Sequence, residues 1–344
     1  MHEFRGLTVV TGGAGLIGSA LIWALNRRNV ENILVVDRLD TTEKWRNLVP
    51  LRFADYLDAD AFEERFVTDP HAFGEIGTVL HLGACSATTE RDAGFLMTNN
   101  YAYTRNIARV ALEESIRFVY ASSAATYGGL EAHLSEERDL HSLRPLNAYA
   151  FSKHAFDLHA QHHGWLSQIC GIKYFNVFGP NESHKGEMRS LVDKAFHQIR
   201  DNGSIALFKS HRPDYRDGEQ ERDFVYIKDA VEMTLHLAQS NVNGLFNVGS
   251  GQAHTWLDLV RPIFAAMDCP EKIEFIAMPD HLHGKYQYST CADIKKLRAT
   301  GYDRVMTPLR DAVTDYVRNY LLTDRRLDPS DAPIPTFAYV KGDP

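Results

Sequence analysis

Cysteine is scarce in this sequence, and no stretch of it is hydrophobic enough to cross a membrane. Among 344 residues there are four cysteines, which are far apart and form no Cys-x-x-Cys pair: Cys85, Cys170, Cys269 and Cys291. This spacing predicts reduced thiols in a cytoplasmic protein. No uninterrupted apolar run reaches the ~20 residues of a membrane helix, and the N-terminus enters an apolar strand without a cleavable signal. We therefore expect a soluble protein with no membrane partner.

An excess of positive charge is also absent, as are internal repeats and low-complexity segments. Lys and Arg total 37 against 45 Asp and Glu, which gives a formal net charge of −8. A general nucleic-acid binder needs a basic surface, so we expect no nucleic-acid partner. A local basic pocket for a phosphorylated small molecule remains compatible with this charge. The length allows a large core, in one large domain or two smaller ones.

The stretch from Leu7 to Ala24, LTVVTGGAGLIGSALIWA, predicts a strand, a glycine turn and a helix in that order. Its apolar, β-branched start is typical of a buried parallel strand. Gly12, Gly15 and Gly18 follow at a Gly-x-x-Gly-x-x-Gly spacing. Glycines let the backbone approach a diphosphate, and the helix N-terminus offers free N–H groups and a partial positive charge. The pattern predicts nucleotide binding; the alternative is a tight turn without a ligand.

Two opposing signals for the type of dinucleotide follow the next apolar run, Ile33 to Val36. Asp37 stands where a dinucleotide fold places the residue that meets the adenosine ribose, and a carboxylate there favours NAD. Arg38 and Lys44 carry cations that would instead favour the 2′-phosphate of NADP, unless they are merely solvated. Asp55, after another apolar stretch, is a candidate neighbour of the adenine.

Apolar runs and helical patterns alternate along the first half of the chain. Further strands are expected at Thr78 to Leu82, Arg117 to Ala121 and Ile172 to Phe178, with helices between them. This order is typical of a doubly wound parallel sheet. Beyond it, strands are expected at 224–227, 245–248 and 273–277, and helices at 188–199, 229–239, 256–267 and 308–321.

A proton relay is indicated where the fourth expected strand ends and a helix follows. Ser123 lies at the carboxyl end of that strand, where such sheets bind ligands. Tyr149 and Lys153 are four residues apart, so they share one helical face. A lysine ammonium beside a phenol lowers the phenol's pKa, which gives a base for an alcohol proton. Tyr-x-x-x-Lys alone is weak evidence, but the glycine turn and the serine make chance a poor explanation.

Two other groups of polar residues stand out in this part of the chain. Four histidines follow Lys153 on the same helix, at positions 154, 159, 162 and 163, but no carboxylate or thiol is arranged with them for coordination. We expect a solvated helix face and no metal. Lys185 lies in a polar loop after the strand that ends at Phe178. It could hold a substrate diphosphate or move a proton, or it could be a solvated lysine.

Several motifs resemble those of the extended short-chain dehydrogenase/reductase family, in the branch that acts on nucleotide sugars. They are TGGAGLIG at 11–18, YASSAATYGG at 120–129, YAFSK at 149–153, YFNVFGP at 174–180, RDFVYIKD at 222–229 and FNVGSG at 246–251. The resemblance thus covers nearly the whole chain. Within that branch, GACSATTE at 83–90, NESHKGEM at 181–188 and PDHLHGKYQ at 279–287 are similar to segments of epimerases that act on an ADP-linked heptose in lipopolysaccharide synthesis.

This resemblance implies an isomerase that inverts C6 of an ADP-linked manno-heptose by transient oxidation with tightly bound NADP, with NAD as the alternative. Tyr149, assisted by Lys153, would serve one orientation of the sugar and Lys185 the other, while Ser123 bonds the reacting oxygen. The alternatives are another nucleotide-sugar epimerase, such as a UDP-sugar 4-epimerase, or a non-catalytic NADP-binding regulator. The family also suggests a homo-oligomer, in particular a pentamer.

Position and resemblance together give the expected contacts. Cofactor contacts are expected at Gly12, Gly15, Leu16, Ile17, Gly18, Asp37, Arg38, Lys44, Asp55, Gly83, Ala84, Cys85, Ser86, Asn99, Lys153 and Val177. Substrate contacts are expected at Ser86, Ser123, Asn176, Lys185, Glu187, Lys194, Phe208, Lys209, Ser210, His211, Arg222 and Tyr286. Leu82, Glu187 and Lys194 depart from the family pattern, as does a long charged insertion at 211–220.

The expected fold is a Rossmann-type doubly wound parallel sheet with a smaller C-terminal α/β domain that binds the substrate. Residues 1–179 and 223–250 would form the dinucleotide domain, and residues 180–222 and 251–325 the substrate domain. The proline-rich segment 326–344 is expected to be an extended tail.

Overall fold

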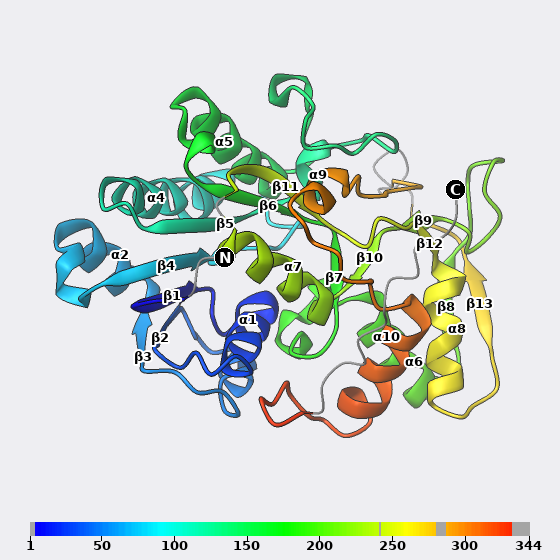
Figure 1. Ribbon diagram of the computed structural model, residues 1–344. Helices are drawn as coiled ribbons and strands as arrows, with labels where there is room; N and C mark the ends of the chain where they lie inside the picture. Colours follow the sequence, from blue (N-terminus) through cyan, green and yellow to red (C-terminus); the bar gives the residue numbers. More distant parts are fainter. Residues whose placement is uncertain (1–3, 241, 280–286, 332–344) are drawn as a thin grey trace.

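A parallel sheet with helices on both faces forms the centre of the molecule (Figure 1). The computed structural model describes residues 4–240, 242–279 and 287–331. The seven strands lie in the order β11-β6-β5-β4-β1-β2-β3, and all neighbours are parallel. Their bounds are β1 Leu7–Thr11, β2 Ile33–Asp37, β3 Asp55–Asp58, β4 Ile76–His81, β5 Arg117–Ser123, β6 Cys170–Tyr174 and β11 Gly244–Val248.

The order of the strands reverses at β1. From β1 the chain runs outward to β2 and β3, then returns to add β4, β5 and β6 on the other side. Ligands of such sheets bind at the carboxyl ends of the strands where the order reverses. The expected Rossmann-type doubly wound sheet is therefore confirmed, and it fixes where a site should lie.

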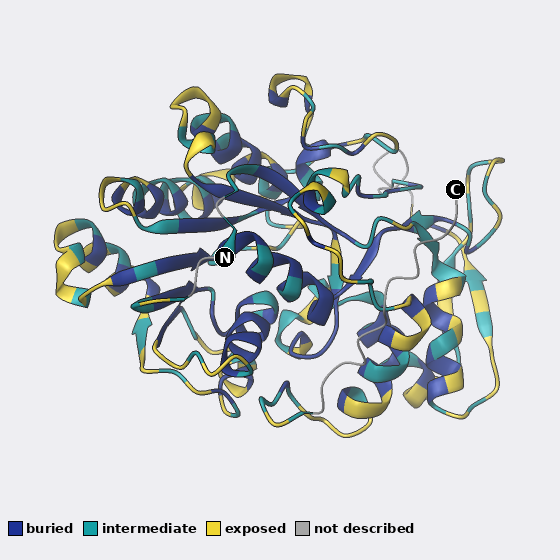
Figure 2. Cartoon of the chain, in the orientation of Figure 1, coloured by how far each residue is buried: buried dark blue, intermediate teal, exposed yellow. Residues whose placement is uncertain are grey.

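Alternating side chains along the strands supply two hydrophobic cores, one on each face of the sheet. Val10 and Leu80 point into a core shared with α1 (Leu16–Asn26) and α7 (Ile227–Gln239). Val9 and Val79, their chain neighbours, point into the other core, which α2 (Ala59–Thr68), α4 (Tyr103–Glu113) and α5 (Ala148–His162) cover. Figure 2 shows the sheet strands buried and the outer helix faces exposed. Both faces are thus covered, as a fully parallel sheet requires.

The first core continues into a second group of elements beside the sheet (Figure 1). It comprises α6 (Leu191–Asn202), α8 (Trp256–Ala266), α10 (Leu309–Tyr316) and the parallel pair β8 (Ile205–Phe208) and β13 (Ile273–Ile276). Two short α-helices and two strand pairs are smaller: α3 Ala93–Leu96, α9 Lys295–Ala299, β7 Asn176–Phe178 with β10 Phe224–Tyr226, and β9 Glu221–Arg222 with β12 His254–Thr255. Short helical segments complete the described chain: η1 Glu43–Asn47, η2 Pro70–Phe73, η3 Met97–Ala102, η4 Ala124–Tyr127, η5 Leu140–Ser142, η6 Trp165–Ser167, η7 Ser183–Met188 and η9 Val317–Leu321.

The strand expected over 172–178 is broken at Phe175. Its first part, β6, lies between β5 and β11, whereas β7 pairs with β10. At the break, Phe175 donates its N–H to the carbonyl of Val248 at 3.0 Å, and Asn176 donates to that of Asp223 at 3.2 Å. The backbone therefore changes partner strand between these two residues. The expectation of one continuous strand was wrong, because both halves are apolar and only the partners separate them.

The first residues of the expected tail pack against the body. Leu327 is fully buried, and Trp23 of α1 donates its indole N–H to the carbonyl of Asp328 at 2.9 Å. The N–H of Leu327 donates to the side chain of Asn181 at 3.0 Å. Residues 332–344 lie outside the described part. Over that part, no helix is both long and apolar enough to span a bilayer.

Candidate active site

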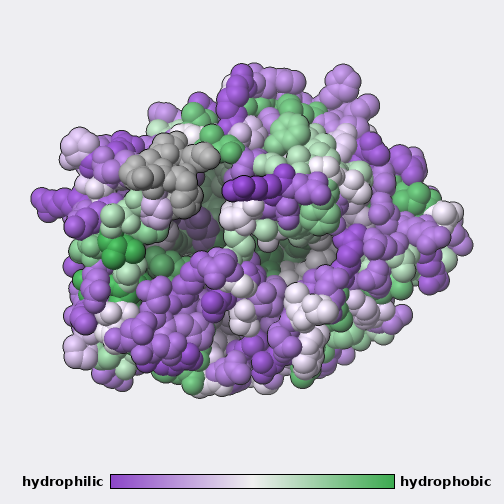
Figure 3. All heavy atoms as spheres, turned by 180° about the vertical axis from the view of Figure 1, so that it is seen from behind, coloured by the Kyte–Doolittle hydropathy of each residue, from purple (hydrophilic) through white to green (hydrophobic). Residues whose placement is uncertain are grey.

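A cleft of about 1340 Å³ follows the carboxyl ends of β1, β2, β4, β5 and β7. Seen from behind, the surface is hollowed near the middle of the molecule, with hydrophobic side chains inside the hollow and hydrophilic ones around it (Figure 3). Most of the expected site residues line this cleft: Gly12, Gly15, Leu16, Ile17, Gly18, Asp37, Arg38, Lys44, Gly83, Ala84, Cys85, Ser86, Asn99, Ser123, Tyr149, Lys153, Asn176, Val177 and Lys185. The sheet topology brings them together, as expected of its switch point.

The glycine turn between β1 and α1 leaves room that only glycine can leave. Gly12 has φ +66°, and a Cβ there would lie 2.8 Å from the N atom of Gly83. A Cβ on Gly18 would lie 2.1 Å from the carbonyl oxygen of Gly12. Helix α1 begins at Leu16, directly behind the turn, so its N-terminal N–H groups face the cleft. These residues fit a dinucleotide diphosphate.

At the end of β2, the side chains that we expect to contact the ribose already have partners within the protein. The Asp37 carboxylate accepts the N–H of Ala14 at 2.8 Å and pairs with the Lys44 ammonium at 2.8 Å. Arg38 pairs with Asp60 and donates to Asn99 at 2.6 Å. Cations therefore border this end of the cleft, one of them held in place by the Asp37 carboxylate.

A set of hydrogen bonds from asparagine side chains, here called the strap, connects this end of the cleft to the loop that carries Lys185. Asn47 of η1 is buried and donates to the carbonyls of Ala14 at 2.9 Å and Asn181 at 3.0 Å. The Asn181 amide in turn donates to Ser19 of α1 at 2.9 Å. Three segments that are distant in sequence are thus fastened around the glycine turn.

The residues of the expected proton relay lie where β5 ends against α5. Asn147 caps α5 by accepting the N–H of Ala150 at 2.8 Å, which sets the start of the helix that carries Tyr149 and Lys153. Ser123 hydrogen-bonds the Tyr149 phenol. The buried Lys153 ammonium donates to the carbonyl of Ala121 at 2.8 Å.

The pKa values of these groups differ from the expectation in one respect. Burial lowers the pKa of Lys153 to about 8. Burial also raises the pKa of Tyr149, and the hydrogen bond with Ser123 offsets this only in part. We expected a lowered phenol pKa. In the protein alone the opposite holds, because desolvation disfavours the phenolate.

Lys185 enters the cleft from η7, the short helical segment after β7. Burial lowers the pKa of its ammonium, and the carboxylate of Glu182 acts in the opposite direction. Glu182 is itself fully buried and accepts from Ser190 twice, from its N–H at 2.6 Å and from its hydroxyl at 2.6 Å. The turn that carries Lys185 is therefore closed by a buried carboxylate.

Some expected contacts lie outside the lining of the cleft. Asp55 is exposed at the start of β3, and Arg222 donates to the carbonyl of Gln287, a residue that does line the cleft. Lys194 pairs with Glu187 at 3.5 Å, so two positions that depart from the family pattern contact each other. The segment Phe208, Lys209, Ser210 and His211 also lies apart from the lining, and Tyr286 lies outside the described residues.

Sequence reasoning missed other residues at or under the site. Asn147, Arg189 and Trp256 line the cleft, and only Asn147 carried a local signal, as a helix cap. Under the relay lie the buried Asp157 and Lys173. Asp157 follows Lys153 by one helical turn, a spacing that could have identified it.

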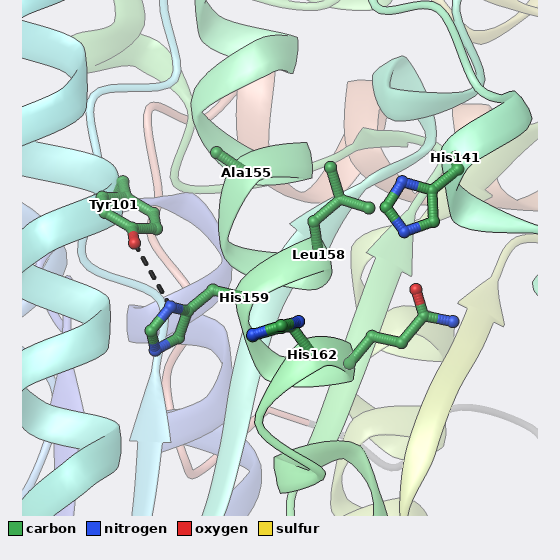
Figure 4. A pocket seen from close by; sticks show the side chains of 7 residues that line it. Tyr101, His141, Ala155, Leu158, His159 and His162 are labelled. Atoms are coloured by element: carbon green, nitrogen blue, oxygen red, sulfur yellow. Dashed lines mark hydrogen bonds between the residues drawn. The ribbon is translucent and has the colours of Figure 1, made fainter.

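A shallower pocket of about 520 Å³ lies over the histidine-rich face of α5 (Figure 4). Tyr101 bonds His159 at 3.3 Å, and the rings of His159 and His163 lie 4.3 Å apart. His141 and His162 also border it. Among the described residues, no group of three or more ligating side chains is arranged to hold a metal ion.

The comparisons with known proteins agree with this fold. The family model of the NAD dependent epimerase/dehydratase family matches residues 8–249, and the chain belongs to that family. The chain is 50% identical over 315 residues to the ADP-L-glycero-D-manno-heptose-6-epimerase of Nitratidesulfovibrio vulgaris, covering 91% of this chain and 97% of the relative. It is 43% identical over 326 residues to the enzyme of the same name from Fusobacterium nucleatum, covering 92% and 98%.

Solved structures of other proteins have the same fold. The ADP-L-glycero-D-manno-heptose-6-epimerase of Helicobacter pylori is similar with a TM-score of 0.77 at 25% identity, covering 92% of this chain and 96% of that one. A UDP-N-acetylglucosamine 4-epimerase from Methanobrevibacter ruminantium has a TM-score of 0.76 at 21% identity, covering 94% and 100%, and shares the fold.

Proposed function

We infer that this protein is an isomerase that interconverts the C6 epimers of ADP-glycero-D-manno-heptose, a precursor of lipopolysaccharide heptose. The observation that carries this inference is the meeting of two lysines from different elements, the buried Lys153 and the half-buried Lys185, in one cleft with the glycine cradle. A one-way dehydrogenase uses one proton-handling group, whereas two such groups on different elements can serve the two orientations of the sugar in an epimerase. The heptose as substrate is supported by the relatives at 50% and 43% identity.

The cofactor is a nicotinamide dinucleotide, and we propose NADP, with NAD as the alternative. The glycine cradle and the N-terminus of α1 would hold its diphosphate. Arg38 and Lys44 border the adenosine end and offer charge to a 2′-phosphate, although each already has a carboxylate partner. When bound, the nicotinamide supplies a hydride acceptor and a positive charge that favours the phenolate of Tyr149.

The residues of the chain would handle the proton that accompanies each hydride transfer. C6 of the heptose has no neighbouring carbonyl, so direct deprotonation is not feasible and oxidation to a ketone must precede inversion. We propose that Ser123 hydrogen-bonds the reacting oxygen while Tyr149 takes or returns its proton, with Lys153 holding charge nearby. After the sugar turns, Lys185 performs the same proton transfer from its own element. Asn176, at the start of β7, lies in the lining where it can contact the sugar.

One assay tests this proposal against its alternatives. Purified protein is incubated with ADP-D-glycero-D-manno-heptose, and the C6 epimers are resolved by NMR or chromatography. Interconversion without net cofactor reduction is expected. Turnover of UDP-galactose instead would support a UDP-sugar 4-epimerase, and no turnover of either sugar with cofactor bound would support a non-catalytic regulator. The intact Ser123, Tyr149 and Lys153 favour an enzyme, because binding alone requires no proton relay.

The remaining expectations stand as proposals. We propose a cytoplasmic homo-oligomer, a pentamer by family resemblance, with the dinucleotide and substrate domains divided near residues 180, 222 and 250. The four cysteines are all free thiols, which supports a reducing compartment. Light scattering on the purified protein would give the oligomeric state.

A further inference from the structure

A fully buried ion pair lies one layer beneath the proton relay. Asp157 follows Lys153 by one turn of α5, and its carboxylate pairs with the ammonium of Lys173 on β6 at 2.6 Å. Both side chains have zero exposure to solvent. Neither residue lines the cleft, so neither is available to contact substrate or cofactor.

Hydrogen bonds extend this pair to every element that carries the relay. The Asp157 carboxylate accepts the hydroxyl of Tyr120 at 2.9 Å and that of Ser122 at 2.7 Å, both on β5. Lys173 also donates to the hydroxyl of Thr126 in η4 at 2.7 Å. Thr126 donates in turn to the carbonyl of Ser123 at 2.7 Å. The end of β5, the following turn and α5 are thus joined through one carboxylate and one ammonium.

Stability alone explains this arrangement poorly. Removing two charges from water is costly, and replacing a buried ion pair by apolar residues of similar volume is often neutral or stabilising. The pair has instead a specific position, between the two elements that fix the Lys153 ammonium. Its helix, α5, carries Lys153, and its carboxylate accepts from two hydroxyls of β5, the strand that carries Ala121, whose carbonyl accepts from that ammonium.

We propose that Asp157, held by Lys173, is a positioning residue for Lys153, which fixes the Lys153 ammonium against β5 and keeps it protonated. The proposal rests on the proposed function, in which Lys153 holds charge beside Tyr149. Asp157 itself touches no reacting atom.

The charged and titratable groups around Lys153 agree with this role. Burial is the main influence on the pKa of Lys153 and lowers it to about 8; Asp157 acts against burial, and Cys85, from the loop after β4, acts in the same direction as Asp157. His81 on β4 also faces Lys153, but burial lowers its pKa to about 3, so it is uncharged at neutral pH. Lys173 is compensated by its own contact with Asp157. Asp157 is therefore the main charge that opposes the effect of burial on the pKa of Lys153, and its removal is the direct test.

The test is the pH profile of epimerisation in Asp157→Asn, which keeps the shape of the side chain and removes its charge. Because Lys153 must be protonated and its pKa falls without Asp157, the alkaline limb should move to lower pH by on the order of one unit. Asp157→Glu restores the charge and should return the limb toward the wild-type position. Tyr120→Phe removes one hydrogen bond to Asp157 and no charge, so its limb should coincide with that of the wild type.

A second variant covers the case in which Asp157→Asn does not fold. The double variant Asp157→Asn/Lys173→Met removes both charges, a change that buried pairs often tolerate, and should show a smaller shift in the same direction, because the loss of the Lys173 cation offsets part of it. Thermal melting and the absorbance of bound nicotinamide verify folding. If the wild type epimerises and the alkaline limb of folded Asp157→Asn or of the double variant coincides with the wild-type limb, the role of Asp157 is refuted while the proposed function stands. A wild type that binds cofactor without epimerising its substrate overturns both.

Discussion

Two lysines face the same cleft from unlike surroundings. Lys153 lies inside the 15-residue helix α5, 5% exposed, with its ammonium on the carbonyl of Ala121. Lys185 lies on the six-residue segment η7, and its ammonium has no hydrogen bond to any residue within 4–240, 242–279 or 287–331. A helix packed on a sheet thus positions one cation, whereas a short turn positions the other.

Each lysine has a buried carboxylate on its own segment, but the two carboxylates differ. Asp157 has a second cation, Lys173, at 2.6 Å. Burial raises the pKa of Glu182, and Lys185 is the first of the groups that lower it. Asp157 is therefore compensated by a cation other than Lys153, whereas the charge of Glu182 is compensated mainly by Lys185 itself. We expect the second side to tolerate movement, as a group that meets a turned sugar requires.

The largest effect is expected from removing the proton carrier on the Lys153 side. Tyr149→Phe should lower epimerisation by about 10²–10⁴-fold, because the phenol can no longer accept or return the alcohol proton. The bound cofactor should be retained, which its absorbance after gel filtration would show. Tyr101→Phe, on the histidine-rich face of α5, is the matched control and should leave turnover unchanged.

Lys185→Met should come next, at about 10²-fold or more, because the turned sugar then lacks its proton carrier. Cofactor should again remain bound. The matched control is Lys295→Met, a lysine that is 92% exposed. Near-normal turnover in Lys185→Met would show that Tyr149 serves both orientations, and the comparison between two sides would fail.

Glu182→Gln should have a smaller effect, about tenfold on turnover. The neutral amide cannot accept from both groups of Ser190, so the turn loosens, and without the carboxylate the pKa of Lys185 falls. Steady-state rates measured across pH would detect both changes. Glu137→Gln, at an exposed position, serves as the control. A rate equal to the wild type would mean that η7 holds its shape without Glu182.

Lys153→Met should raise stability at neutral pH while it lowers activity. The folded-state pKa of Lys153, about 8, lies below its ordinary value of 10.5, so the protonated lysine opposes folding below pH 8. Removing it should raise the free energy of unfolding at pH 7 by about 1–3 kcal/mol. The gain should shrink as pH rises from 8 to 10.5. Denaturant unfolding at pH 7 and pH 10 measures it, and Lys185→Met, less buried, should gain less.

The Lys153 side of the cleft could be predicted from the sequence better than the Lys185 side. The sheet, the glycine turn and the pair Tyr149 and Lys153 follow from spacings within a few residues, and those are the parts that were predicted. The strand β3 was missed because its sequence, DYLD, carries carboxylates at an exposed sheet edge. For Lys185, only the family resemblance favoured a functional role over a solvated side chain.

Other features depend on contacts between separate helices, strands and turns. The pairing of Asp157 with Lys173, and of Asp37 with Lys44, requires two elements to meet before either charge has a meaning. The raised pKa of Tyr149 depends on burial, which a helical spacing does not report. The ion pairs and the raised pKa of Tyr149 arise only in the folded protein, so local spacing in the sequence does not predict them.

The strap around the glycine turn also bears on how the protein is synthesised. The turn is among the first segments to leave the ribosome, whereas Leu327, which donates its N–H to the strap residue Asn181, follows some three hundred residues later. A nascent chain that has already completed the sheet therefore still lacks a contact that backs its cofactor cradle. The hydrogen bonds that support the glycine turn are therefore complete only when this C-terminal contact has formed.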